Sequence, residues 1–291
     1  MPARPGTILV TGATGLQGGA VLRHLVACRF PVRVLTRDPE SERARRLSST
    51  GIEVVRADLT DRESLDRALE GVDGVFSMAT PFQQGLDAEV AQGTTLGDAA
   101  KAAGVRHYVY SSVGAAERDT GIPHFETKWR IEQHLRGLEL PLTVLRPVWF
   151  YENFNSYGME QVGDAYEIRG PMRPETRLQM IAADDVGAFV ALAFGRPHEW
   201  IGRELEIAGD ELTMAQIAEA IQSHTGVYTD YVQVPMEQVR AYSEDLARMW
   251  EYLEREGYQA DLHQLRRLLP DLTAFAEWLE KGGLRRAAPA A

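Results

Sequence analysis

The sequence predicts an α/β fold of the Rossmann type, a doubly wound parallel sheet with a smaller C-terminal α+β lobe. Over the first half of the chain, short runs rich in β-branched residues alternate with longer amphipathic stretches, the pattern of βαβ units. A glycine-rich turn follows the first run, and the character of the sequence changes after Pro147. We therefore expect one domain over residues 1–150 and a smaller lobe over 151–291, whose strands could return to the main sheet.

Six strands are expected in the first domain, each bounded by turn residues. They lie at residues 7–11, 32–36, 52–57, 72–78, 107–112 and 142–147. Amphipathic helices fill the gaps at about 16–29, 39–49, 61–70, 86–103 and 125–137. Right-handed crossovers place helices on both faces of such a sheet, so a ligand is expected beyond the carboxyl ends of the strands.

The second lobe begins with FYENFNSYG and IRGPMRPETRLQ, which are rich in turn residues and aromatic residues and show no clean alternation. Beyond them we expect helices at 184–195 and 213–225, the second opened by Thr213. Strands are expected at 203–208 and 228–234, and several helices complete the chain.

Composition excludes several classes of function. The chain has 291 residues, of which 44% are hydrophobic and 25% charged, as in ordinary globular proteins. Its formal net charge of -11 would repel a phosphate backbone, so we expect no direct nucleic-acid binding. No apolar run approaches the roughly 20 residues that span a bilayer. The opening MPARPGTILVTG has no signal-type pattern. We expect no membrane segment and a cytoplasmic location.

Cys28 is the one cysteine of the chain. A single thiol cannot form an intrachain disulfide or a thiolate metal cluster, and we expect no metal site. Cys28 lies in the apolar pattern of the first helix, which predicts a buried small hydrophobic residue.

The turn after the first strand reads GATGLQG, with Gly12, Gly15 and Gly18 spaced as GxxGxxG. In the Rossmann pattern the first glycine permits the sharp turn from strand to helix. The second lets a pyrophosphate approach the backbone, and the third allows close packing of helix on strand. The N–H groups at the start of the helix then face the anion. The domain over 1–150 is therefore predicted to bind a dinucleotide.

The end of the second strand indicates which dinucleotide is preferred. An acidic residue there would accept hydrogen bonds from the adenosine ribose of NAD, whereas this chain has Thr36-Arg37-Asp38. A guanidinium at Arg37 matches a ribose 2′-phosphate, which favours NADP(H) over NAD(H). The alternative is a solvated arginine with Asp38 facing the ribose.

Asp58 and Leu59 end the third strand. The carboxylate could accept from the adenine amino group while Leu59 packs on the ring. Alternatively, Asp58 caps the helix that begins near Asp61.

With GATGLQG, TRD, ADL, EVAQGTTLGDAAKAAGVRHYVYSS, HFETKWRIEQHL and LRPVWFYENF, the chain resembles the NmrA-like family of atypical short-chain dehydrogenases/reductases. The resemblance covers most of the chain. It implies a set of cofactor contacts around both ends of the dinucleotide. They are Gly12, Thr14, Gly15, Leu16, Gln17, Arg37, Asp58, Ala79, Lys128 and the segment from Pro147 through Phe150 to Asn153. From their positions in the sequence, we expect Gly18, Leu59 and Ser111 to contact the cofactor as well.

Short-chain dehydrogenases usually carry Tyr-x-x-x-Lys on the helix that follows the fifth strand, and a serine at that strand's end. Here Lys128 is present and Ser111 or Ser112 could supply the hydroxyl, but the tyrosine position is His124. His124 and Lys128 share one helix face. We assign these two residues to the candidate catalytic position, with a non-catalytic contact or cap as the alternative for His124 and a solvated lysine as that for Lys128.

An aromatic group follows the sixth strand, where the nicotinamide end and a planar substrate would lie. It comprises Trp149, Phe150, Tyr151, Phe154 and Tyr157. Such rings could line a pocket or pack within the lobe.

Two functions fit these observations. The first is an NADP(H)-binding redox sensor that signals to a regulatory protein partner. Such a sensor needs the phosphate cradle formed by the GATGLQG turn, and it needs no catalytic tyrosine. The second is an NAD(P)H-dependent reductase of quinones or similar planar acceptors, in which solvent or His124 supplies the proton.

Overall fold

The computed structural model describes residues 6–156 and 158–285 and divides them into two units. The first unit comprises the chain up to Glu117, His124–Arg146 and Val186–Leu205. The second comprises Arg118–Pro123, Pro147–Asp185 and the chain from Glu206 onward. The chain therefore passes between the units more than once.

The first unit is built on a seven-stranded sheet in the order β11-β6-β5-β4-β1-β2-β3. Its strands are β1 (Thr7–Val10), β2 (Val32–Thr36), β3 (Glu53–Arg56), β4 (Val72–Ser77), β5 (His107–Ser111), β6 (Leu142–Pro147) and β11 (Glu204–Ile207). The pairings from β3 through β1 and β4 to β6 are all parallel. The strand order reverses between β1 and β4, which is the point where Rossmann sheets bind ligands. The predicted fold class is confirmed.

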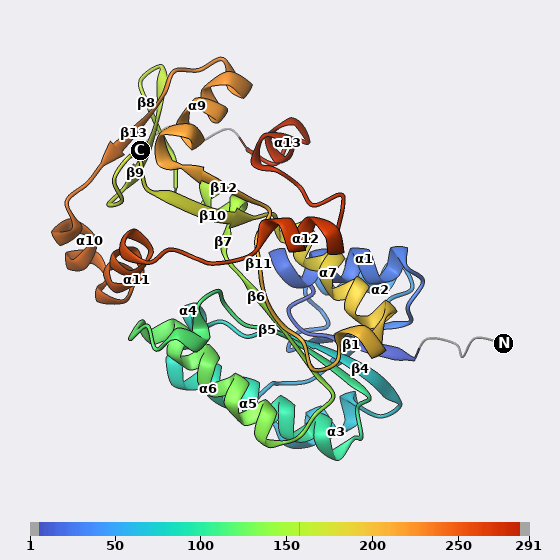
Figure 1. Cartoon of the computed structure of the whole chain (residues 1–291). Helices are drawn as coiled ribbons and strands as arrows, with labels where there is room; N and C mark the ends of the chain where they lie inside the picture. Colours follow the sequence, from blue (N-terminus) through green and yellow to red (C-terminus); the bar gives the residue numbers. More distant parts are fainter. Residues whose placement is uncertain (1–5, 157, 286–291) are drawn as a thin grey trace. The chain divides into compact units, whose positions relative to one another are not determined.

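Helices cover both faces of this sheet (Figure 1). On one face lie α1 (Leu16–Ala27), α2 (Glu42–Ser49) and α7 (Ala183–Gly195), and on the other α3 (Arg62–Ala68), α5 (Leu86–Ala102) and α6 (Pro123–Gly137). Short helical turns are α4 (Pro81–Gln84), α8 (Pro197–Trp200) and η1 (Ala116–Arg118). Under α3, α5 and α6, a continuous core joins Leu9, Leu65, Val75, Leu96 and Ile131.

The second unit contains two three-stranded sheets. One joins β12 (Asp210–Thr213), β10 (Arg177–Ile181) and β7 (Trp149–Phe150); the other joins β13 (Thr229–Gln233), β9 (Ala165–Gly170) and β8 (Glu160–Val162). Its helices are η2 (Tyr151–Asn155), α9 (Met214–Thr225), α10 (Met236–Tyr242), α11 (Glu244–Arg255), α12 (Leu262–Leu268) and α13 (Phe275–Glu280). Thr213 opens α9 as predicted, with a reciprocal capping box to Gln216.

Two features differ from the sequence predictions. Strands β7, β8, β9, β10 and β12 were not predicted. β7, β8 and β12 have only two to four residues, whereas the polar and apolar alternation of β9 (AYEIRG) and β10 (RLQMI) was overlooked between turn-rich segments. The prediction that Cys28 is buried is wrong, since Cys28 is exposed at the C-cap of α1. The buried face of α1 ends at Leu25, and Val26, Ala27 and Cys28 are all exposed.

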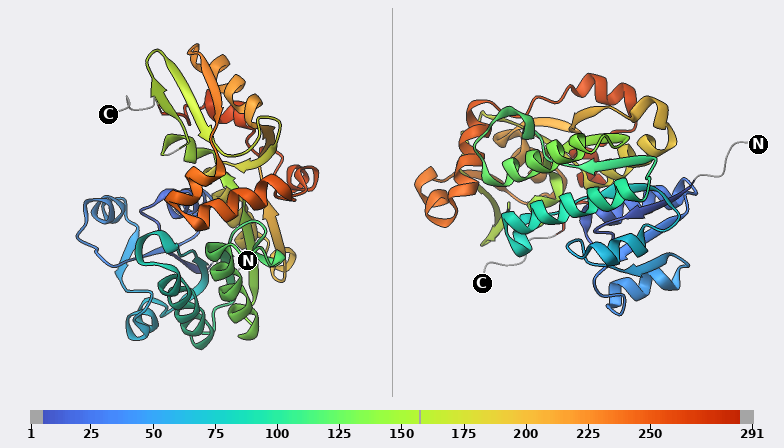
Figure 2. Two further views of the ribbon diagram at one scale, coloured as in Figure 1. Left: turned by 90° about the vertical axis from the view of Figure 1, so that its left-hand side faces the viewer. Right: turned by 90° about the horizontal axis from the view of Figure 1, so that it is seen from below.

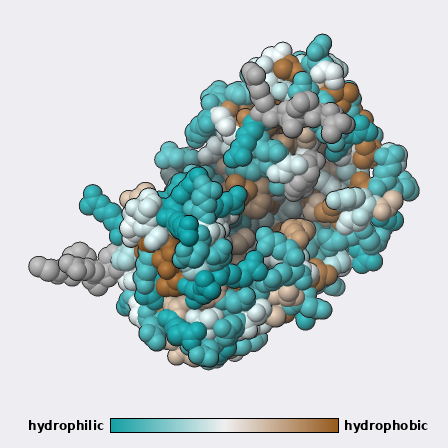
Figure 3. Space-filling model, turned by 180° about the vertical axis from the view of Figure 1, so that it is seen from behind, coloured by the Kyte–Doolittle hydropathy of each residue, from teal (hydrophilic) through white to brown (hydrophobic). Residues whose placement is uncertain are grey.

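The surface view in Figure 3 is largely hydrophilic, with hydrophobic residues visible only in patches. No helix within the described ranges is long and apolar enough to cross a membrane. Among those same residues, no group of three or more His, Cys, Asp or Glu side chains could hold a metal ion.

Candidate functional site

The glycine-rich turn joins β1 to α1 with the geometry that the sequence predicts. Gly12 has φ +65°, a conformation that L side chains rarely adopt, and it turns the chain sharply. A β-carbon added to Gly18 would lie 2.3 Å from the Gly12 oxygen and 2.6 Å from the Thr11 oxygen. Both positions therefore require glycine, one for the turn and one for the close packing of helix on strand.

Gly15 is the N-cap of α1, and none of the described side chains caps this helix end. Its backbone is extended, with φ -100°. A helix start without a side-chain cap presents N–H groups and the positive end of the helix dipole to a ligand. An anionic group placed at Gly15 would satisfy these donors, as the sequence pattern predicts.

Three further residues of the loop surround this helix end. Leu16 is 53% exposed, and Thr14 is half-buried. Gln17 is buried, yet its Oε1 atom has no hydrogen-bond partner among the described residues. A buried polar atom without a partner is costly, and a bound polar ligand is one means of satisfying it.

A pocket of about 260 Å³ lies at the carboxyl ends of β2 and β3. It is lined by Arg37, Arg56, Ala57, Asp58, Asp61, Ser64 and Arg67. Arg37 and Arg56 are exposed, and neither side chain forms a hydrogen bond or ion pair with any of the described residues. Two guanidinium groups in one pocket suit a phosphate group. Sequence analysis missed Arg56, although it occupies on β3 the position that Thr36 occupies on β2.

Asp58 lies in this pocket, and its Oδ1 atom accepts hydrogen bonds from the Thr60 N–H at 2.8 Å and the Thr60 hydroxyl at 2.7 Å. These bonds, with the nearby Arg37 charge, lower the pKa of Asp58. The alternative in which Asp58 caps the next helix is wrong, because Asp61 is the N-cap of α3. Leu59 packs partly buried against the core beneath α3 and α5.

Lys128 occupies α6, where its side chain is only 11% exposed. Its Nζ atom lies 2.7 Å from Glu89 Oε1 and donates a hydrogen bond to the carbonyl oxygen of Ala79, just beyond β4. The alternative of a solvated helix lysine is therefore wrong. Glu89 is fully buried, and sequence analysis missed it because its partner is 39 positions away along the chain.

His124 lies in the first turn of α6, one turn before Lys128. Its ring packs edge-on against Phe125 at 4.7 Å between centroids and lies 5.9 Å from the ring of Phe82. Phe82 belongs to α4 and is 76% exposed. An exposed phenyl ring and an imidazole thus stand together near Lys128, and sequence analysis missed Phe82.

Ser111 and Ser112 end β5, and both are buried. Neither hydroxyl has a hydrogen-bond partner among the described residues. Like Gln17, they are polar groups at the carboxyl ends of the strands that a bound ligand would satisfy.

The predicted contacts from Pro147 to Asn153 belong to the second unit. Pro147 ends β6, Phe150 ends β7 and is half-buried, and Asn153 lies half-buried in η2. Of the aromatic group, Tyr151 and Phe154 pack against Phe275 at 5.2 and 5.6 Å. Trp149 packs against Trp250 at 4.9 Å, and Tyr157 lies outside the described residues. These contacts favour lobe packing over a pocket lining for Trp149, Tyr151 and Phe154.

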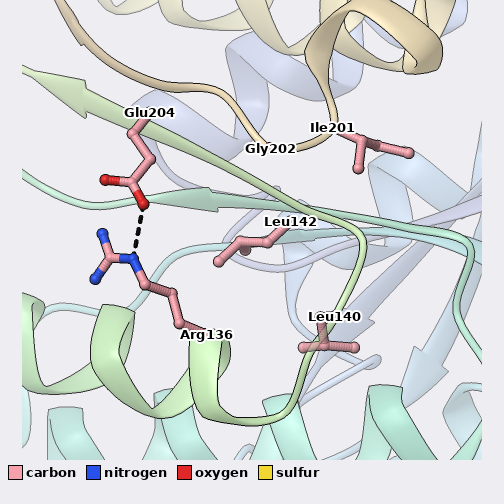
Figure 4. A pocket seen from close by; sticks show the side chains of 6 residues that line it. All are labelled: Arg136, Leu140, Leu142, Ile201, Gly202 and Glu204. Atoms are coloured by element: carbon pink, nitrogen blue, oxygen red, sulfur yellow. Dashed lines mark hydrogen bonds and ion pairs between the residues drawn. The ribbon is translucent and has the colours of Figure 1, made fainter.

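Another pocket, of about 230 Å³, lies beside β6 and the turn before β11 (Figure 4). Arg136 Nε donates to Glu204 Oε1 at 2.7 Å across it. Arg136 also pairs with the buried Glu132, which in turn binds Arg146. This ion network holds α6 against the edge of the sheet, and the carboxylates already neutralise the guanidinium groups.

The first unit is thus a Rossmann-type domain, with a glycine-rich turn between its first strand and its first helix. The chain belongs to the NmrA-like family, whose model matches residues 4–279.

Among characterised relatives, an NmrA-like family domain-containing protein of Dictyostelium discoideum is 29% identical, with 94% of this chain and 97% of that protein covered. An NAD(P)H azoreductase of Xenophilus azovorans is 30% identical, with 80% and 79% covered.

The fold is similar to that of solved structures. NmrA, a negative transcriptional regulator solved in complex with NADP, is 24% identical with a TM-score of 0.81, and 97% of this chain and 98% of that one are covered. The NADPH-dependent quinone oxidoreductase QOR2 of Escherichia coli, solved with NADPH, is 24% identical with a TM-score of 0.78, over 95% and 100%.

Proposed function

We propose that the chain is an NAD(P)H-dependent reductase that prefers NADP(H) and passes a hydride to quinones or similar planar acceptors. The observation that carries this proposal is the placement of the exposed Phe82 ring beside His124, one helical turn from the buried Lys128. An exposed aromatic ring offers a flat apolar surface on which a planar acceptor can stack.

The cofactor would be held by groups whose geometry suits it. The start of α1 at Gly15 receives the pyrophosphate, and Arg37 with Arg56 receives the ribose 2′-phosphate. Asp58 keeps its second carboxylate oxygen for the adenine amino group. At the other end, Lys128 and Ser111 supply donors for the nicotinamide ribose, and we retain Thr14, Leu16, Gln17, Ala79, Pro147, Phe150 and Asn153 as further contacts.

When bound, the dinucleotide supplies a hydride. A quinone takes up that hydride and one proton to give the hydroquinone, so the residues need only orient the acceptor and furnish the proton. His124 is one candidate donor of this proton, and solvent can replace it. The absence of the tyrosine at this position is therefore tolerable, because no alcohol or ketone must be activated. Among the relatives, the azoreductase is named for another acceptor class that is planar and electron-poor.

A redox sensor is the second candidate, and the likeness to NmrA over nearly the whole chain favours it. A sensor would bind NADPH and NADP+ with different consequences for a protein partner, and would turn over neither. The glycine-rich turn serves both functions equally, whereas the exposed ring of Phe82 beside His124 favours the reductase, in which a second molecule stacks there.

The test is oxidation of NADPH, followed by absorbance, with a panel of quinones and azo dyes. We expect steady turnover by the wild-type protein and at least about a tenfold loss of kcat/KM in Phe82→Ala for planar acceptors, from lost stacking. Tyr242→Ala, which removes another exposed ring in the second unit, is the matched control. Tight NADPH binding without oxidation by any acceptor would refute the reductase and leave the sensor.

A further inference from the structure

Glu89 and Lys128 form a buried ion pair between two helices. Glu89 lies in the first turn of α5 and is fully buried. Its Oε1 atom is 2.7 Å from Lys128 Nζ, and its Oε2 atom accepts a hydrogen bond of 2.5 Å from the Thr127 hydroxyl. The two carboxylate oxygens therefore face two consecutive residues of α6, Oε2 through a hydrogen bond and Oε1 through an ion pair without a hydrogen bond.

The close approach of α5 and α6 brings this carboxylate to Lys128. The helices run side by side (Figures 1 and 2). A β-carbon on Gly93 would lie 2.7 Å from Ile131, and one on Gly97 would lie 2.5 Å from Leu135. Glu89, Gly93 and Gly97 follow one another at four-residue spacing, as do Thr127, Ile131 and Leu135, so one face of each helix meets the other. The two glycines fix the register in which Glu89 reaches Lys128.

The contacts of Lys128 determine which of its N–H donors remain for a ligand. A lysine ammonium has three N–H donors. One is donated to the carbonyl oxygen of Ala79, while Glu89 Oε1 holds the ammonium as an ion pair without a hydrogen bond, so the other donors remain for a ligand. Glu89 also neutralises the charge of Lys128, and burial of either group alone would be strongly unfavourable.

We propose that Glu89 is the positioning residue of the nicotinamide half of the site. Through the ion pair it holds the Lys128 ammonium so that an N–H not bound to Ala79 is presented to a ribose hydroxyl of the dinucleotide, a role that rests on the proposed cofactor function. The pair has no net charge, so Lys128 acts as an oriented hydrogen-bond donor.

The experiment compares the binding of the whole dinucleotide with the binding of its adenosine half. Wild-type protein, Glu89→Gln, Lys128→Met and the double variant are titrated calorimetrically with NADPH and with adenosine 2′,5′-bisphosphate, which lacks the nicotinamide half. We expect Glu89→Gln to weaken NADPH binding about tenfold and adenosine 2′,5′-bisphosphate binding less than about twofold. Lys128→Met should weaken the binding of each ligand by about the same factor as Glu89→Gln. The double variant should lose no more NADPH affinity than either single variant.

Asp87→Asn is the matched control, because Asp87 lies in the same turn of α5 and is exposed. Thr127→Val provides a second route if Glu89→Gln does not fold, since it removes one hydrogen bond to Glu89 and leaves the charges intact. It should weaken NADPH binding in the same direction by a smaller factor, again sparing adenosine 2′,5′-bisphosphate.

Each contrary outcome has a distinct meaning. Equal losses for both ligands would mean that Glu89 supports the fold alone, and unchanged NADPH binding in Glu89→Gln would equally overturn its positioning role. Wild-type protein that binds neither NADPH nor NADH would instead overturn the proposed cofactor function.

Discussion

Gly18 lies so close to Gly12 that an added β-carbon would come within 2.3 Å of the Gly12 carbonyl oxygen. In an exposed helix, replacing glycine by alanine stabilises the helix by up to about 1 kcal/mol. At Gly18 the steric conflict is with backbone atoms, which cannot move aside without displacing the loop. We predict that Gly18→Ala lowers the free energy of unfolding by about 1–3 kcal/mol and abolishes measurable dinucleotide binding.

Gly137→Ala is the control for this prediction. Gly137 ends α6, and an added β-carbon there would meet nothing within 4 Å. Denaturant unfolding should find it as stable as the wild type or slightly more so. If Gly18→Ala proved as stable and as competent in binding as Gly137→Ala, the packing argument for the loop would be wrong.

The preference for NADP(H) is predicted to depend on Arg37. A hydrogen bond to a charged group contributes about 1.5–3 kcal/mol, so Arg37→Ala should weaken NADPH binding about ten- to a hundredfold. NADH binding should change less than about threefold, because NADH has no 2′-phosphate for the guanidinium to bind. Arg56→Ala should show the same asymmetry at smaller magnitude.

Arg106→Ala serves as the control for Arg37, because Arg106 precedes β5 at the opposite end of the strands and pairs with Asp73. Calorimetric titration with NADPH and NADH measures all three variants. Equal losses for the two cofactors in Arg37→Ala would contradict the assignment of the pocket at β2 and β3 to the 2′-phosphate.

Asp185, in the second unit, makes stability depend on pH. It accepts hydrogen bonds of 3.1 Å from both the N–H and the hydroxyl of Thr273, yet burial raises its pKa to about 6. The folded chain therefore binds this proton more tightly than the unfolded chain, in which the pKa is about 4. Its contribution to the free energy of unfolding falls as the pH rises from about 4 to about 6.

Asp185→Asn removes this titration. Urea unfolding between pH 4 and pH 7 should show the variant gaining about 2–3 kcal/mol relative to the wild type as the pH rises. A difference between the two proteins that stayed constant over this range would contradict the prediction.

His107 is predicted to make the protein less stable as the pH falls, which is the opposite of the pH dependence that Asp185 causes. Thr143 donates its one hydroxyl hydrogen to the Trp200 carbonyl, so it accepts from His107 Nε2 at 2.8 Å. Burial lowers the pKa of His107 to about 4, so stability is lost as the pH falls from about 6.5 towards 4. His107→Gln keeps a donor for Thr143 and should lose less stability on acidification than the wild type, by about 3 kcal/mol. Parallel acid unfolding curves for the two proteins would rule this out.

The sheet of the first unit could be predicted because each strand is a β-branched run closed by turn residues. The phosphate cradle could be predicted because each of the three glycines at fixed spacing has its own structural role in a Rossmann turn. Arg37 followed from its position at a strand end, and the same reasoning applied to β3 would have found Arg56. These features are all encoded over a few consecutive residues.

The features that were missed depend on contacts between distant segments. Glu89 resembles any helical glutamate until α5 packs against α6, although the small residues at Gly93 and Gly97 signal a close helix contact. Phe82 lies in a short turn with no periodicity. Cys28 was misplaced because the apolar pattern of α1 continues past Leu25, the last residue of the helix that the fold buries.

The most direct test of the account is calorimetric titration of the purified protein with NADPH, NADP+, NADH and NAD+. We predict binding of all four, with NADPH and NADP+ bound at least about tenfold more tightly than their NAD counterparts. Titrations without heat or saturation for every dinucleotide would contradict the assignment of the glycine turn as a phosphate cradle, and with it the proposed reductase.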